Sequence, residues 1–180
     1  MSLQAVEFDP FAREAEPPAL QRLAMTSSQR EVFAAVQMSR DAPAAFNLCN
    51  ILRLKGPLDL TALREALSHV VMRHAALRTS LSPDGQLQLI HAVVPVELPR
   101  VDLGDLNEHD AALALTELAE QEAGTALDIH SAPLWRVPVL SWAEQEHALV
   151  FNAHHVISAG WSFSVLFADW ALAYSAQLTG

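Results

Sequence analysis

Apolar residues recur at three- and four-residue spacing along residues 59–78, the pattern of a helix with one buried face. Either Asp59 or Thr61 can cap the N-terminus of such a helix, because both side chains accept hydrogen bonds from free backbone N–H groups. The positions of the stripe are Leu63, Leu67, Val70, Val71 and His74. This segment therefore predicts an amphipathic helix whose stripe ends near Arg78.

Three more helices are predicted. One starts at Ser27, a candidate N-cap, with Glu31 in its first turn. A second covers residues 108–122, which are rich in the strong helix formers Ala, Leu and Glu, and stops near Gly124. The last begins near Trp161 and is apolar around much of its circumference. It is therefore either deeply buried or shares its surface with something outside this chain.

Alternating apolar and polar residues predict strands elsewhere. Residues 47–54 alternate in this way and end at a Gly-Pro turn. The sequence Pro-Asp-Gly at 83–85 lies between two alternating runs, which is typical of a hairpin. Residues 135–140 and 146–153 read as an antiparallel pair joined by a polar turn at 142–145.

Composition limits the organisation of the chain. With 180 residues, 51% of them hydrophobic and 18% charged, the sequence is typical of one folded domain with a real core. Residues 1–23 mix acids with prolines and show no sustained period. We therefore expect an N-terminal leader over 1–23 and a single folded unit over 24–180.

The charge and the cysteine content limit which binding partners and which cellular compartment are expected for this chain. The net charge of −10 repels phosphate backbones, and Lys55 is the only lysine, so nucleic acid is not expected as a partner. Acidic residues among the first twenty exclude a secretory signal, and the apolar run at 153–168 is too short to span a bilayer. The single cysteine, Cys49, cannot form an internal disulfide, which fits a cytoplasmic protein.

Residues 152–162 form the segment most suggestive of chemistry, because a predicted strand ends there and a helix begins. Neighbours on a strand point to opposite faces, so His154 and His155 cannot both bind one ion without a break in the strand. No Cys, Asp or Glu lies nearby at ligand spacing, and no metal site is expected. Ser158 and Ser162 lack the flanking glycines of a nucleophile elbow.

What remains is one imidazole that acts as a general base or as a hydrogen-bond partner for a charged intermediate. Gly160 favours this, since a residue without a side chain lets a substrate approach the backbone. The spacing alone leaves open that both histidines are ordinary core residues.

Three segments in order resemble the motifs of condensation domains of nonribosomal peptide synthetases. Residues 154–162 resemble the His-His-x-x-x-Asp-Gly-Trp-Ser motif, and residues 73–79 resemble the Arg-His-x-x-Leu-Arg-Thr element. Residues 26–30 are similar to the opening Ser/Thr-and-Gln element. Three motifs in order are far more specific than a lone histidine pair, so the resemblance disfavours the core-histidine alternative.

The resemblance implies an α/β fold, a single chloramphenicol acetyltransferase-like lobe with a mixed, mostly antiparallel sheet packed against helices. It implies the N-terminal lobe of a condensation domain, with a second lobe to follow Gly180. The implied reaction joins a carrier-bound acyl or peptidyl thioester donor to a carrier-bound aminoacyl acceptor through an amide bond. No cofactor is expected on the domain itself, because the substrates ride on phosphopantetheine arms of carrier proteins. The isolated lobe is not expected to be competent.

The resemblance also assigns roles to residues. His155 would take a proton from the attacking amine, or place the amine and stabilise the tetrahedral intermediate. His154 and Arg78 would be structural supports, and Gly160 would line the site. Ala159 stands where the family motif has Asp, which raises the alternative of a non-catalytic carrier-binding or docking module. A starter type that accepts an acyl group is a further option.

Overall fold

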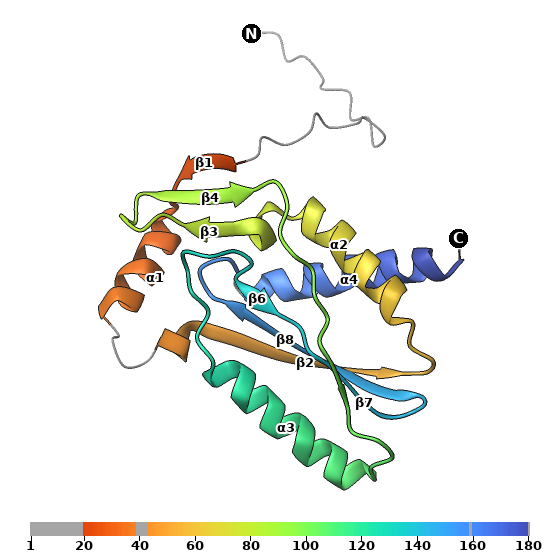
Figure 1. Ribbon diagram of the computed structural model, residues 1–180. Helices are drawn as coiled ribbons and strands as arrows, with labels where there is room; N and C mark the ends of the chain where they lie inside the picture. Colours follow the sequence, from red (N-terminus) through yellow and green to blue (C-terminus); the bar gives the residue numbers. More distant parts are fainter. Residues whose placement is uncertain (1–19, 39–42, 159, 180) are drawn as a thin grey trace.

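The structure is a computed structural model that describes residues 20–38, 43–158 and 160–179 (Figure 1). Most of the predicted leader, residues 1–19, and Ala159 lie outside this part of the chain. The last residues of the predicted leader belong to a strand, β1 (Leu20–Ala24), which pairs antiparallel with β4 (Leu87–His91). None of the described helices is long and apolar enough to cross a membrane.

The strands form two sheets. The larger has the order β2-β8-β7-β5, and β6 also pairs with β8. Its members are β2 (Asn47–Lys55), β5 (Arg100–Asp102), β6 (Trp135–Arg136), β7 (Val139–Ala143) and β8 (Glu146–His154). The smaller sheet has the order β1-β4-β3, with β3 at Thr79–Leu81. Only β5 and β7 pair in parallel among the described strands, so the predicted mixed, mostly antiparallel sheet is confirmed.

Helices cover both faces of the larger sheet (Figure 1). The helices α2 (Leu60–Arg73) and α4 (Gly160–Thr179) lie together on one face, and α3 (Glu108–Gly124) covers the other. Helix α1 (Ser27–Met38) lies beside the smaller sheet, and two short 3₁₀ turns, η1 (Pro43–Phe46) and η2 (Ala75–Arg78), complete the described elements. Each side chain of β8 therefore faces either α2 and α4 or α3.

Local capping explains where two helices begin. Asp59, not Thr61, caps α2, because its Oδ1 accepts a hydrogen bond of 2.9 Å from the backbone N–H of Ala62. The cap of α1 is Thr26 rather than the predicted Ser27. Thr26 Oγ1 accepts from the Gln29 N–H at 3.2 Å, and Gln29 Oε1 accepts from the Thr26 N–H at 2.9 Å. This reciprocal pair is a capping box.

The region before β8 differs from the prediction. The single strand expected over residues 135–140 is two strands, β6 and β7, interrupted at Pro138, which has no N–H to donate to a sheet. The turn expected at 142–145 is shorter, because Trp142 belongs to β7 and is buried against α3. Burial of a large indole outweighs the local turn pattern there.

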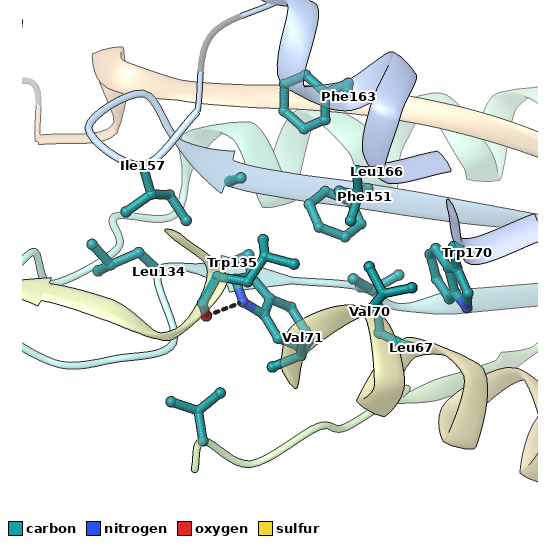
Figure 2. Packing of buried hydrophobic residues seen from close by; sticks show 14 of the residues in the cluster. Leu67, Val70, Val71, Leu134, Trp135, Phe151, Ile157, Phe163, Leu166 and Trp170 are labelled. Atoms are coloured by element: carbon teal, nitrogen blue, oxygen red, sulfur yellow. Dashed lines mark hydrogen bonds between the residues drawn. The ribbon is translucent and has the colours of Figure 1, made fainter. Parts of the chain in front are cut away.

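An aromatic cluster on the α2/α4 face fixes the helix that follows β8 (Figure 2). Phe151 of β8 stacks on Trp135 with ring centroids 6.0 Å apart. Its edges meet Phe163, Phe167 and Trp170 of α4 at 5.9, 5.7 and 6.4 Å. Trp135 is anchored in turn, since its Nε1–H donates to the Leu77 carbonyl at 2.8 Å. The core thus sets the direction in which the chain leaves the histidine pair.

Candidate active site

Backbone hydrogen bonds hold the turn that follows β8 in one conformation. The N–H of His154 donates to the Leu134 carbonyl at 2.9 Å, and the N–H of His155 donates to the Phe46 carbonyl at 2.7 Å. Within the turn, the N–H of Ile157 donates to the His154 carbonyl at 3.1 Å. The two histidines are therefore fixed from both sides, by the segment that leads into β6 and by η1.

The His154 side chain is fully buried on the α3 face of β8. Its Nδ1 accepts a hydrogen bond of 3.1 Å from the backbone N–H of Val156. Burial, with a smaller contribution from the charge of neighbouring His155, lowers the pKa of His154 to about 4. The ring is therefore neutral at pH 7 and carries its proton on Nε2.

The His155 side chain is exposed, on the opposite side of the chain from that of His154. The strand alternation predicted that one of the pair would face inward, and the structure identifies His154 as that residue. His155 borders an open recess of about 280 Å³ between the turn and the first half of α1. Thr26 and Gln29, which form the capping box of α1, line the same recess.

A second recess adjoins the same turn and shares three lining residues with the first. It has a volume of about 260 Å³ and is bordered by η2, β8 and α4. Its wall is apolar apart from His74, Ser158 and Ser162, and the first of these is paired with Asp169 at 2.7 Å. Ile157, Ser158 and Ser162 border both recesses. The histidine turn thus borders two adjoining recesses.

Arg78 is a buried residue of η2 whose side chain holds neighbouring backbone segments together. Its guanidinium is buried and donates to four backbone carbonyls, of Val71, Met72, His91 and Ala92. Two of these belong to the C-terminal end of α2, where carbonyls lack helical partners and the helix dipole favours a cation. Arg78 therefore has its positive charge satisfied without a carboxylate.

The C-terminal end of α3 is tied to the same region of the sheet. Asn47 Nδ2 donates to the carbonyls of Ala123 and Thr125 at 3.0 and 2.8 Å. Asn152 Nδ2 donates to the Glu122 carbonyl at 2.8 Å. These bonds supply side-chain partners to carbonyls at the end of α3, where the helix provides few N–H donors.

Two predicted site residues cannot be assigned contacts. Ala159 lies outside the described residues, and Gly160 is placed as the first residue of α4. In the described part of the chain, no three His, Cys, Asp or Glu side chains lie where they could hold one metal ion.

A family model of the condensation domain matches residues 20–180 of this chain. The chain belongs to the condensation-domain family. Chondramide synthase of Chondromyces crocatus is 33% identical over 156 residues, which are 86% of this chain and 4% of the synthase. A linear gramicidin synthase of Brevibacillus parabrevis is 32% identical over 160 residues, 88% of this chain and 2% of that protein.

Solved structures agree with this assignment of a condensation domain. The X-domain in complex with OxyB from teicoplanin biosynthesis is 29% identical, with a TM-score of 0.76 over 98% of this chain and 37% of that one. The starter condensation domain of rhizomide synthetase, 22% identical, shares the fold with a TM-score of 0.78 over 89% of this chain and 38% of its own. The chain thus spans well under half of these structures and a few per cent of the synthetases.

Sequence reasoning gave no role to Asn152 or Asn47, which lie beside His154, and did not place Gln29 at the His155 recess. Asn152 lies two positions before His154, so strand alternation places both on one face and could have identified it. Asn47 is opposite His154 across β2 and β8, a long-range pairing that no local pattern reveals. Gln29 was placed in a family element, but its position beside the His155 recess depends on how α1 packs.

Proposed function

We propose that this chain is the N-terminal lobe of a condensation domain that forms an amide bond with His155 at its centre. The observation that carries the proposal is the contrast between a rigid backbone and an accessible ring. His155 is held by its N–H at Phe46, while its side chain is exposed in a recess. A fixed, accessible imidazole suits a group that accepts a proton from an amine or orients it.

The two recesses that border the turn support a reaction between two substrates. A carrier-bound thioester would reach the turn from one side and a carrier-bound amine from the other. The carriers present these groups on phosphopantetheine arms, so the domain itself needs no bound cofactor. Ser158 and Ser162 border both recesses and would lie close to the reacting groups.

A second lobe is the other partner that this proposal requires. One face of α4 carries the exposed apolar side chains Val165 and Leu172, which are seven residues apart, and the only charged residue of the helix is Asp169. An apolar helix face of this kind is typical of a surface that packs against another part of the protein. We propose that the second lobe packs there and closes the recesses.

Ala159, in place of the motif Asp, does not leave Arg78 without partners. The motif Asp would add a carboxylate near the turn, but Arg78 already has four carbonyl partners. Within the described lobe, the substitution therefore leaves no unpaired buried arginine at Arg78. The competing proposal is a non-catalytic docking module, favoured by Ala159 and by the similarity to an X-domain that was solved with a partner protein.

The test uses the parent domain extended past Gly180, with a carrier-loaded acyl donor and an aminoacyl-carrier acceptor. Amide product is followed by mass spectrometry in the unmodified domain and in the His155→Ala and Ala159→Asp variants. We expect His155→Ala to reduce the rate by about 10²- to 10⁴-fold, the usual contribution of general acid–base catalysis. The matched control is His109→Ala, an exposed histidine of α3, which should retain activity.

Each outcome separates the two proposals. Product that depends on His155 supports a working site that tolerates Ala159. Product only in Ala159→Asp would show that the scaffold is sound and that the docking role applies to the natural sequence. No product from any variant, with both carriers loaded, would favour the docking module.

A further inference from the structure

Three buried polar atoms lie close to the histidine turn with no hydrogen-bond partner among the described residues. They are Nε2 of His154, Oδ1 of Asn152 and Oδ1 of Asn47. The other polar atom of each side chain is already bound: His154 Nδ1 accepts from Val156, and both asparagine amides donate to carbonyls at the end of α3. These bonds fix the orientation of all three side chains.

The three side chains share one place in the fold. Asn47 is directly opposite His154 in the β2–β8 register, and Asn152 lies two residues before His154 on the same strand. All three therefore project from the α3 face of the sheet, beneath the C-terminal end of that helix. Side chains directly opposite have Cβ atoms about 5 Å apart, and neighbours two apart on a strand lie roughly 7 Å apart.

The chemistry of the three atoms is complementary to one small molecule. His154 presents an Nε2–H donor, because its Nδ1 is an acceptor. Asn152 and Asn47 present carbonyl oxygens, which are acceptors. A single imidazole proton cannot satisfy two acceptors, so direct bonding among the three would leave one oxygen unpaired. Water can accept from the N–H and donate to both oxygens, and buried waters typically make about three hydrogen bonds.

We propose that one water molecule is bound between His154, Asn152 and Asn47, and that the two asparagines are positioning residues for the histidine turn. The water links the His154 ring to β2 and to the end of α3. The backbone of His154 in turn holds the turn that carries His155, through the bonds to Leu134 and Ile157. Only the catalytic consequence rests on the proposed amide-forming function.

The binding site is tested by crystallography of the parent domain at a resolution that shows ordered water. We expect one water within hydrogen-bonding distance of all three atoms, and its loss or displacement in Asn152→Leu. The control is Asn50→Leu, since Asn50 lies on β2 opposite Phe151 and faces away from the site. If Asn152→Leu does not fold, Asn47→Ala removes another of the three partners. Direct bonding of His154 Nε2 to an asparagine, with no water between, would overturn the proposal.

The positioning role is tested by nuclear magnetic resonance and kinetics. In ¹⁵N-histidine-labelled domain at neutral pH, the proton of His154 should reside on Nε2, and its resonance should shift in Asn152→Leu but not in Asn50→Leu. We expect Asn152→Leu to lower kcat about tenfold with KM for either carrier unchanged, as for the loss of one supporting hydrogen bond. An unchanged kcat would overturn the positioning role. A domain that shows the water but forms no product would contradict the proposed function and still support the water site.

Discussion

On one face of β8, Phe151 and Leu149 pack among the aromatic and aliphatic side chains of α4 and α2. On the other face, Asn152 and His154 are bound through directed hydrogen bonds, to the end of α3 and to the following turn. The first face is held by burial, which is not directional. The second is apolar at Ala148 and Val150, but at Asn152 and His154 it is held by bonds that have a required geometry.

The apolar face therefore determines where the histidine turn lies, and the polar residues determine how it is oriented. Aromatic packing places α4 against the sheet, and so decides the path of the chain after the histidines. The polar face fixes the ring of His154 and the backbone around it. His155, next along the chain, is left with a rigid backbone and an exposed ring. The two faces can therefore be disturbed separately, and the effects should differ in kind.

The largest stability effect should come from the apolar face. Phe151→Ala removes a fully buried ring that contacts Trp135 and three aromatic residues of α4. We expect a loss of about 3–5 kcal/mol in the free energy of unfolding, from lost burial and the cavity that remains. Urea unfolding of the parent domain measures it.

The matched control for Phe151 is its neighbour Val150, which is equally buried but faces α3. Val150→Ala deletes two methyl-sized groups and should cost about 2 kcal/mol. If both variants lost the same stability, the aromatic cluster would not be the main support of this strand, and the contrast between the faces would fail.

The next largest effect should be a pH dependence of the free energy of unfolding, caused by His154. This residue and Asn152 form the polar face of β8. Burial lowers the pKa of His154 to about 4 in the folded protein, whereas an unfolded histidine titrates near its usual value of about 6.5. Between these values the unfolded chain binds more protons, so stability falls as the pH falls. The loss should reach up to roughly 3 kcal/mol by pH 4.

Unfolding free energies over this pH range isolate the contribution of His154. In His154→Gln the slope between about pH 6.5 and 4 should be smaller, because the buried titrating group is gone. His109→Gln replaces an exposed histidine of α3 and should keep the slope of the unmodified domain. An identical slope in His154→Gln would mean that other groups control the acid sensitivity.

Local signals predicted much of this arrangement. The start of α2 was predicted with two candidate caps, Asp59 and Thr61, of which the structure selects Asp59. The Pro-Asp-Gly sequence at 83–85 marked the turn between β3 and β4, where Gly85 has φ of +67°. Each is a short-range effect, in which one side chain or one backbone conformation decides the outcome. The alternation rule likewise separated His154 from His155, since it depends only on the pleat of one strand.

Long-range contacts were beyond the sequence pattern. The sequence pattern predicted Trp142 as part of a turn, because its burial against α3 depends on a contact that is distant in sequence. Arg78 was expected to be a structural support, but its partners could not be predicted, because they come from α2 and from residues 91–92, which only the tertiary fold brings together. The same holds for Asn47, whose role depends on the pairing of β2 with β8 across about a hundred residues of chain.

The smallest predicted loss of stability should differ between substitutions at the two ends of α3. At its C-terminal end, Arg136 Nε donates to the Glu122 carboxylate at 2.7 Å and Nη2 donates to the Thr125 carbonyl at 2.8 Å. Arg136→Gln should therefore cost about 1–2 kcal/mol, through lost charge-assisted bonds at a helix end. The loss should be accompanied by faster hydrogen exchange in the last turn of α3.

Arg53 provides the control at the other end of α3, where it pairs with Glu108. Both of these side chains are largely exposed, and such pairs contribute little because water and salt screen them. Arg53→Gln should change stability by less than about 0.5 kcal/mol. The contrast matters because only the C-terminal end of α3 lies over Asn152 and His154. If the two variants lost the same stability, the polar residues of β8 would be held in place by the whole of α3 rather than by the carbonyls at its C-terminal end.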